Sequence, residues 1–296
     1  MASFEIVALS DSVSYVPSLS NVGLWAGPEG TVLIDSGNDA EAGRRILRSL
    51  ENSGRKLSAV FLTHSNADHA GGAAALVSRS GVPIYASRIE SSLCADPILE
   101  PSFVWGGFPP RELKNKFFVA PSCAVSALSE DGSLPPALAG AAVIPLPGHF
   151  FSQCGFLADG VLFAGDALFG TLSIEKHPVF FVYDVAAFLS SLDKIAAAGA
   201  RMVIPSHGTP TEDVASLISI NRAAVERAAS VVGEACAGGA SFEDVLAFVC
   251  VRFGIKLDWA QYALVGSTVR SYLVYLREQS VVDVEFSDGR MLWRAQ

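Results

Sequence analysis

Four apolar segments of this chain each end beside a histidine or an aspartate, and this repeated order restricts the possible folds more than any other feature. The segments and the side chains that follow them are 58–62 with His64, 141–146 with His149, 160–165 with Asp166, and 201–205 with His207. Short apolar segments bounded by turn residues are typical of buried strands. In α/β sheets, ligand-binding side chains gather in the crevice beyond one end of the strands. The sequence therefore predicts an α/β protein with one polar site at its strand ends.

The first of these ends carries several candidate metal ligands close together. His64, Asp68 and His69 lie in the stretch Thr63-His64-Ser65-Asn66-Ala67-Asp68-His69, on a turn that leaves a strand. Imidazole and carboxylate groups suit Zn²⁺, iron or manganese. Asn66 offers an amide oxygen, which is a neutral and weaker donor than imidazole. Of the five histidines, only His177 has no position at a strand end, and it stays unassigned.

This stretch resembles the His-x-His-x-Asp-His signature of the metallo-β-lactamase fold superfamily, with Asn66 in place of the second histidine. The resemblance covers roughly residues 5–211. It rests also on Leu-Pro-Gly-His at 146–149, Phe-Ala-Gly-Asp-Ala-Leu-Phe at 163–169 and Pro-Ser-His-Gly at 205–208. It implies an αββα sandwich, in which two mixed sheets lie between helices.

The resemblance also implies a site for two divalent metal ions. The matching positions are His64, Asn66 and His149 for the first ion, Asp68, His69 and His207 for the second, and Asp166 as the bridge. Zinc is the expected metal, with iron or manganese as alternatives, and Asn66 implies partial occupancy of the first site. Asp68 and Asp166 are the expected catalytic residues. Asp35 matches the carboxylate that supports a ligand histidine in the family, but a plain turn cap before Gly37 fits it equally well.

Two metal ions can share a water molecule, lower its pKa and stabilise a developing oxyanion. The expected activity is therefore hydrolysis of a small ester, thioester, lactone or related acyl substrate. One alternative is a mononuclear iron persulfide dioxygenase, which would need only His64, His149 and Asp166. A second alternative is a non-catalytic binding protein that the metal stabilises.

The chain is expected to divide into residues 1–211, which form the catalytic domain, and residues 212–296. The second part predicts three helices, at about 213–236, 241–253 and 262–278, and a hairpin with an Asp288-Gly289 turn. It resembles the winged-helix module that ends some proteins of the superfamily. We expect it to serve packing, including a homodimer, because its basic residues are matched by acidic ones.

Residues 88–140 form an excursion rich in proline and aromatic side chains, among them Phe103, Trp105 and Phe108. A long segment of this kind is often a lid or a binding loop. An ordinary excursion that packs on its own helices is an equal alternative. If the segment is a lid, its aromatic residues favour an apolar or bulky substrate group.

The net charge of −9 argues against a nucleic-acid partner, because phosphate binding depends on basic surfaces. No apolar segment is long enough to predict a membrane span, and the first residues show no signal-peptide pattern. The five scattered cysteines are expected to be reduced thiols. A cytoplasmic enzyme with a small-molecule substrate is the resulting expectation.

Overall fold

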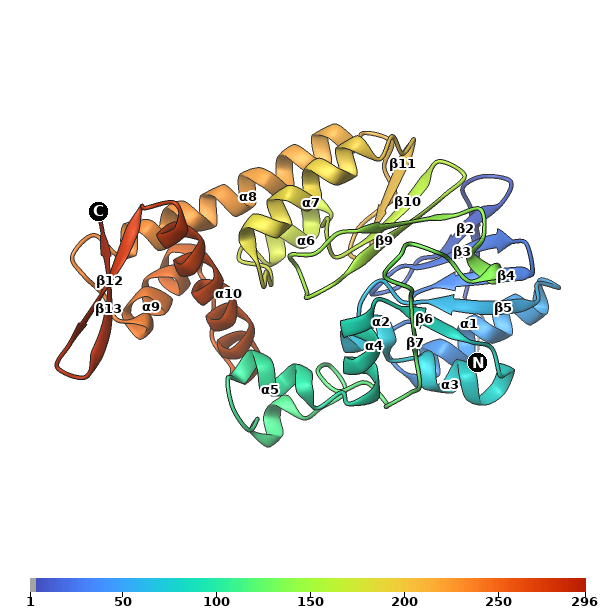
Figure 1. The fold of residues 1–296 in the computed structure, drawn as a ribbon, viewed down its shortest axis with the longest axis horizontal. Helices are drawn as coiled ribbons and strands as arrows, with labels where there is room; N and C mark the ends of the chain where they lie inside the picture. Colours follow the sequence, from blue (N-terminus) through green and yellow to red (C-terminus); the bar gives the residue numbers. More distant parts are fainter. Residues whose placement is uncertain (1–3) are drawn as a thin grey trace.

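A computed structural model describes residues 4–296 and shows two sheets packed face to face (Figure 1). The first sheet has seven strands in the order β1 to β7, antiparallel from β1 to β4 and parallel from β4 to β7. Its strands are β1 Val7–Ala8, β2 Val13–Val16, β3 Val22–Gly27, β4 Gly30–Ile34, β5 Leu57–Phe61, β6 Ile84–Ala86 and β7 Ser126–Ala127. The first predicted strand, 4–9, is wrong in its length, because only Val7 and Ala8 pair with β2.

The second sheet has four strands in the order β11-β10-β9-β8. Only β10 and β11 run parallel, so this sheet is mixed as well. Its strands are β8 Ala142–Pro145, β9 Cys154–Ala158, β10 Val161–Gly165 and β11 Met202–Pro205. Between the sheets, the ring of Phe156 lies 5.6 Å from that of Trp25 and 5.2 Å from that of Phe61. This aromatic contact forms part of the core that joins the two sheets.

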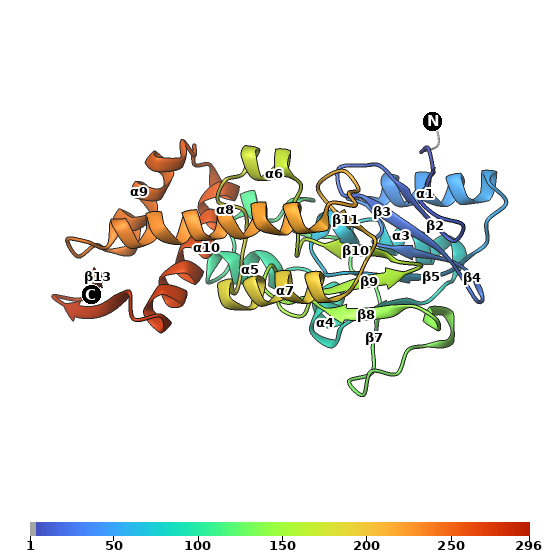
Figure 2. The same cartoon turned by 90° about the horizontal axis from the view of Figure 1, so that it is seen from above.

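Helices cover the outer face of each sheet, and this gives four layers (Figures 1 and 2). On the first sheet, Leu50 and Leu76 from the helices pack against Leu33 of β4 in one core. On the second sheet, Phe188 packs in a core with Leu162 of β10. The helices are α1 Ala40–Asn52, α2 Ala67–Ala70, α3 Ala73–Ser80, α6 Thr171–Lys176, α7 Val185–Ala197 and α8 Val214–Ala235. The predicted sandwich of two mixed sheets between helices is confirmed.

The excursion at 88–140 is not a single loop. It contains α4 Arg88–Ala95, α5 Leu99–Trp105, the 3₁₀ turns η1 Arg111–Leu113 and η2 Pro136–Leu138, and strand β7. Strand β7 extends the first sheet, so this part belongs to the fold itself. Val104 of α5 packs in a separate apolar cluster with Ala263 of the C-terminal helix α10. The segment therefore connects the first sheet with the C-terminal helices.

The C-terminal elements are α8, α9 Phe242–Phe253, α10 Trp259–Glu278 and the hairpin of β12 Val282–Ser287 and β13 Arg290–Ala295. Helix α9 begins with the predicted cap at Ser241, which forms a reciprocal capping box with Asp244. These helices share one continuous core with the second sheet. The domain division at residue 211 and the winged-helix resemblance stay predictions. Among residues 4–296, no helix combines the length and apolar character needed to span a bilayer.

Candidate metal centre

All seven predicted ligand side chains come together at one end of the two sheets. His64 follows β5, Asp166 directly follows β10, and His207 follows β11. Asp68 and His69 lie on the short helix α2, which directly follows Asn66. His64 and His69 are fully buried, and His149 and Asp166 are nearly so. The cluster is thus a polar island inside the protein, as the strand ends predict.

Each histidine of the cluster is held through its Nδ1 atom. The partners are the Thr63 hydroxyl for His64 (3.0 Å), Asp35 Oδ2 for His69 (2.8 Å), the Phe181 carbonyl for His149 (2.9 Å) and the Leu19 carbonyl for His207 (2.8 Å). A carbonyl or carboxylate oxygen only accepts, so Nδ1 of His69, His149 and His207 carries the proton. The Nε2 atoms are therefore the metal-binding atoms of the cluster, as is common when a second group orients a ligand histidine.

The distances between these atoms fit bound metal ions. Asp166 Oδ2 lies 3.6 Å from His149 Nε2 and 3.4 Å from His207 Nε2, and Asp166 Oδ1 lies 3.5 Å from His69 Nε2. Asp68 Oδ2 lies 3.1 Å from His207 Nε2. Ligands of one tetrahedral zinc ion lie about 3.3 Å apart, given bonds of about 2.0–2.1 Å. The central position of Asp166 supports its expected role as a bridge.

Three buried atoms of the cluster have no hydrogen-bond partner among the described residues: His64 Nε2, His69 Nε2 and Asp166 Oδ1. A buried polar atom without a partner costs roughly 1–3 kcal/mol. Three such atoms facing one another are expected where a cation belongs. Oxygen and imidazole donors of this kind fit a divalent metal ion. His69 stands in both groups of close donors, with His64 and Asp166 and with Asp68 and His207.

Asn66 also faces the cluster. Its Oδ1 atom lies 3.2 Å from His149 Nε2. Because the Nδ1 proton of His149 goes to the Phe181 carbonyl, a neutral His149 has a lone pair on Nε2. Two acceptors at this distance repel each other unless a cation lies beside both. The amide oxygen of Asn66 is therefore placed as a candidate ligand.

Charge in the cluster is shared between two carboxylates and two histidines. Burial lowers the pKa of His64 well below its ordinary value and also lowers that of His149, so both imidazoles are neutral. Burial opposes the charge on His207, but Asp166 and Asp68 raise its pKa to about 10. Burial also disfavours ionised Asp166, but His207 and His69 hold its pKa well below the ordinary value. Metal binding therefore displaces protons from histidines of the cluster.

Asp35 is both the turn residue and the support of a histidine, so the two readings of its sequence position do not exclude each other. Its backbone adopts a left-handed conformation with φ of 64°. Its Oδ1 accepts from the backbone N–H of Thr63 at 2.8 Å, and its Oδ2 accepts from His69 Nδ1. Asp35 therefore joins the end of β4 to both ends of the ligand loop.

The sequence profile described as the Metallo-beta-lactamase superfamily matches residues 15–207, which is more than half of the chain. The chain belongs to the metallo-beta-lactamase superfamily. The match includes every residue of the cluster and confirms the family that the 63–69 motif predicted. The predicted enzyme class, a metallohydrolase of this superfamily, is likewise supported by this match and by a curated relative.

That relative is the hydroxyacylglutathione hydrolase of Dechloromonas aromatica (strain RCB), 26% identical over 245 residues, which cover 79% of this chain and 77% of the relative. A beta-lactamase domain protein from Burkholderia ambifaria has a similar structure, with a TM-score of 0.75 and 21% identity over 99% of this chain and 94% of its own. A metallo-beta-lactamase family protein from Thermus thermophilus gives a TM-score of 0.74 and 20% identity over 98% and 100%. The two structures establish the shared fold alone.

Three residues that support this metallo-beta-lactamase centre were not predicted from the sequence. Glu90 is fully buried, accepts from the backbone and hydroxyl of Ser65, and accepts from the backbone of Ser152. Asn21 donates to the carbonyls of Pro205 and Gly208, on either side of His207. Glu100 hydrogen-bonds to Asn66, and burial raises its pKa well above the ordinary value. No local pattern marks these residues, because each acts on a distant loop.

A cavity of about 550 Å³ opens on the centre. Asn66, Asp68, His149, Asp166 and His207 form its polar floor. Its walls are largely apolar and come from four regions: Leu19; Val104, Phe117 and Phe118; Phe169, Val179, Phe180 and Phe181; and Ala260, Leu264 and Val265. Lys176 and His177 also line it, which places the histidine that the sequence left unassigned.

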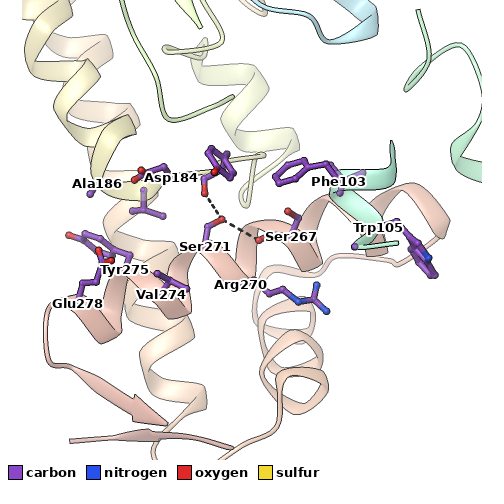
Figure 3. A pocket seen from close by; sticks show the side chains of 14 residues that line it. Phe103, Trp105, Asp184, Ala186, Ser267, Arg270, Ser271, Val274, Tyr275 and Glu278 are labelled. Carbon is purple, nitrogen blue, oxygen red and sulfur yellow. Dashed lines mark hydrogen bonds between the residues drawn. The ribbon is translucent and has the colours of Figure 1, made fainter. Parts of the chain in front are cut away.

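The expectation for the aromatic residues of 88–140 was wrong in its details. Phe103 and Trp105 do not line this cavity, and Phe108 is 83% exposed. Phe103 and Trp105 instead line a second cavity of about 590 Å³ between α5, the start of α7 and α10 (Figure 3). There Ser271 donates to the Tyr183 carbonyl at 2.7 Å. This second cavity contains none of the seven candidate ligands.

Proposed function

We propose that this chain is a hydrolase that uses two divalent metal ions on a small acyl substrate, such as an ester, thioester or lactone. One observation carries the proposal: seven donor side chains converge at the floor of a largely apolar cavity. The relative named hydroxyacylglutathione hydrolase supports an acyl substrate. The assembly of all seven side chains favours two ions over the three-residue iron site of a dioxygenase.

The bound metals would supply a water of lowered pKa and a positive charge for the oxyanion. His64, Asn66 and His149 would hold one ion, and Asp68, His69 and His207 the other, with Asp166 between them. Asp68 accepts from the hydroxyl of Ser20 at 3.0 Å, which fixes one of its oxygens beside His207. Asp68 would then orient the attacking water, while the apolar walls hold the acyl group and exclude bulk water.

The test uses Asp68→Ala and His149→Ala, with Zn²⁺ or Mn²⁺ restored after purification. Both changes remove a donor, so turnover of a panel of thioesters, esters and lactones should fall roughly a thousandfold or more. Asp193→Ala is the control, because this exposed carboxylate pairs only with Arg222 on the surface. Full activity in both site variants would refute the proposal. Tight metal binding without turnover of any substrate would instead support a binding protein.

A further inference from the structure

Glu100 is a buried carboxylate beside the proposed metal centre, but it is not part of the ligand motif. It lies near the start of α5, is 8% exposed, and lines the same cavity as Asn66, Asp68 and His149. None of the ion pairs between side chains of residues 4–296 includes it. A buried carboxylate without a cationic partner is costly. Such a cost is expected at a functional site rather than in a structural core.

The hydrogen-bond partner of Glu100 is the side chain of Asn66. An ionised carboxylate only accepts hydrogen bonds, so the Nδ2 group of Asn66 must face Glu100. The other side of the same amide, Oδ1, then faces the cluster, where it lies 3.2 Å from His149 Nε2. Glu100 thus decides which end of the amide points to the metal centre. Without it, the two ends of the amide have similar shapes and could exchange.

We propose that Glu100 is a positioning residue of the metal centre, which turns the Asn66 oxygen towards the first ion. The Glu100–Asn66 pair then takes the place of the second histidine of the superfamily motif. An amide is a weaker donor than imidazole, but a charged acceptor at its N–H group increases the negative charge on its oxygen. The pair therefore offsets part of the loss that the asparagine causes. This inference rests on the two-ion centre of the proposed function, but its test measures metal binding alone.

The test compares Glu100→Met with the wild type by Zn²⁺ titration against a chelator and by elemental analysis. Methionine keeps the length of the side chain but removes the acceptor. Affinity for one ion should fall about 10–100-fold, the usual loss when the partner of a ligand is removed. Anomalous diffraction at the zinc edge should show that the lost ion is the one beside His149. Glu112→Met, a change at a more exposed glutamate of the same segment, should leave both ions bound.

A second variant separates positioning from a merely structural role. In Glu100→Met, the change Asn66→His should restore the affinity for the first ion to within a few-fold of wild type, because imidazole needs no carboxylate to orient it. The metal-free Glu100→Met protein should unfold at the same temperature as wild type or higher, since a buried charge has been removed. Unchanged zinc affinity in Glu100→Met would overturn the inference. Failure of Asn66→His to restore binding would also overturn it, and would identify Glu100 as a direct ligand or a structural residue.

These results are independent of the hydrolase test. If the wild type binds two ions but turns over none of the acyl substrates, the proposed function fails and the zinc titration still decides the role of Glu100.

Discussion

Asp35 occupies a backbone conformation that most residues avoid and uses it to reach two parts of the ligand loop. Its φ of 64° lies in the left-handed region, where aspartate and asparagine are tolerated better than other side chains. Both of its oxygens are engaged, by Thr63 and by His69. The residue is 1% exposed, so water cannot replace these partners.

The change Asp35→Asn should therefore preserve the backbone but not the centre. An amide has a single acceptor oxygen, so it cannot accept from both Thr63 and His69. We expect zinc affinity to fall about 10–100-fold, with the ion nearest His69 affected most. Chelator competition measures this loss, and Asp159→Asn, at an exposed left-handed position, is the matched control. Equal zinc affinity in Asp35→Asn and wild type would contradict the support role.

Sequence patterns identify the donors of this centre but not the residues that support them. His64, Asp68 and His69 share one short motif, and His149, Asp166 and His207 each follow an apolar strand. Glu90 and Glu100 lie on helices of the excursion and reach the ligand loops only through tertiary packing. Their burial depends on how α4 and α5 sit against the strand ends. Nothing near them in the chain indicates that arrangement.

Helix α1 shows how one side chain fixes the start of an element. Asp39 accepts from the backbone N–H groups of Glu41 and Ala42 at 3.0 and 2.9 Å, and Lys116 lies 3.2 Å away. The hydrogen bond from Ala42 is the main cause that lowers the pKa of Asp39 below its ordinary 3.8. The folded protein thus favours the ionised cap.

Asp39→Ala should destabilise the protein by about 1 kcal/mol near neutral pH, through loss of the helix cap. Because the folded pKa is lowered, the unfolded chain binds the proton more tightly. The contribution of the charge is complete above the unfolded value of 3.8 and disappears as the pH falls through the folded value. Urea unfolding at about pH 7 and about pH 3 measures the change. Asp39→Asn keeps a cap without a charge, so an equal pH dependence in that variant would refute this explanation.

The longer elements follow from their periodicity, and the shorter ones do not. The helices predicted at 213–236 and 241–253 appear at Val214–Ala235 and Phe242–Phe253. Strand β7 has only two residues and pairs with β6 across a long connection, so no local pattern could reveal it. The same reason explains why the excursion could be described from the sequence only as a lid or a packed segment.

Helix α10 joins distant parts of the chain into one site. Its first half contacts Val104 and Phe118 of the excursion and lines the cavity over the metal centre with Leu264 and Val265. Its second half packs in the core of the second sheet through Leu273 and Leu276. The walls that face the acyl group are therefore set by residues far from the ligand motif in sequence.

Leu264→Trp should narrow the cavity and raise KM for substrates with long apolar acyl groups by roughly tenfold, with metal content unchanged. Val274→Trp is the control on the same helix, because Val274 is half exposed and lines only the second cavity. Steady-state kinetics with acyl groups of increasing length measures the effect. A larger KM change in Val274→Trp than in Leu264→Trp would place the substrate in the second cavity.

The donors come from strand ends distributed between His64 and His207 along the chain, so no shorter stretch carries a complete centre. During synthesis on the ribosome, the cage for two ions exists only after β11 has emerged and both sheets have paired. Before that moment, the 63–69 motif is a weak, open chelator. Metal uptake is therefore a late step in the maturation of each molecule.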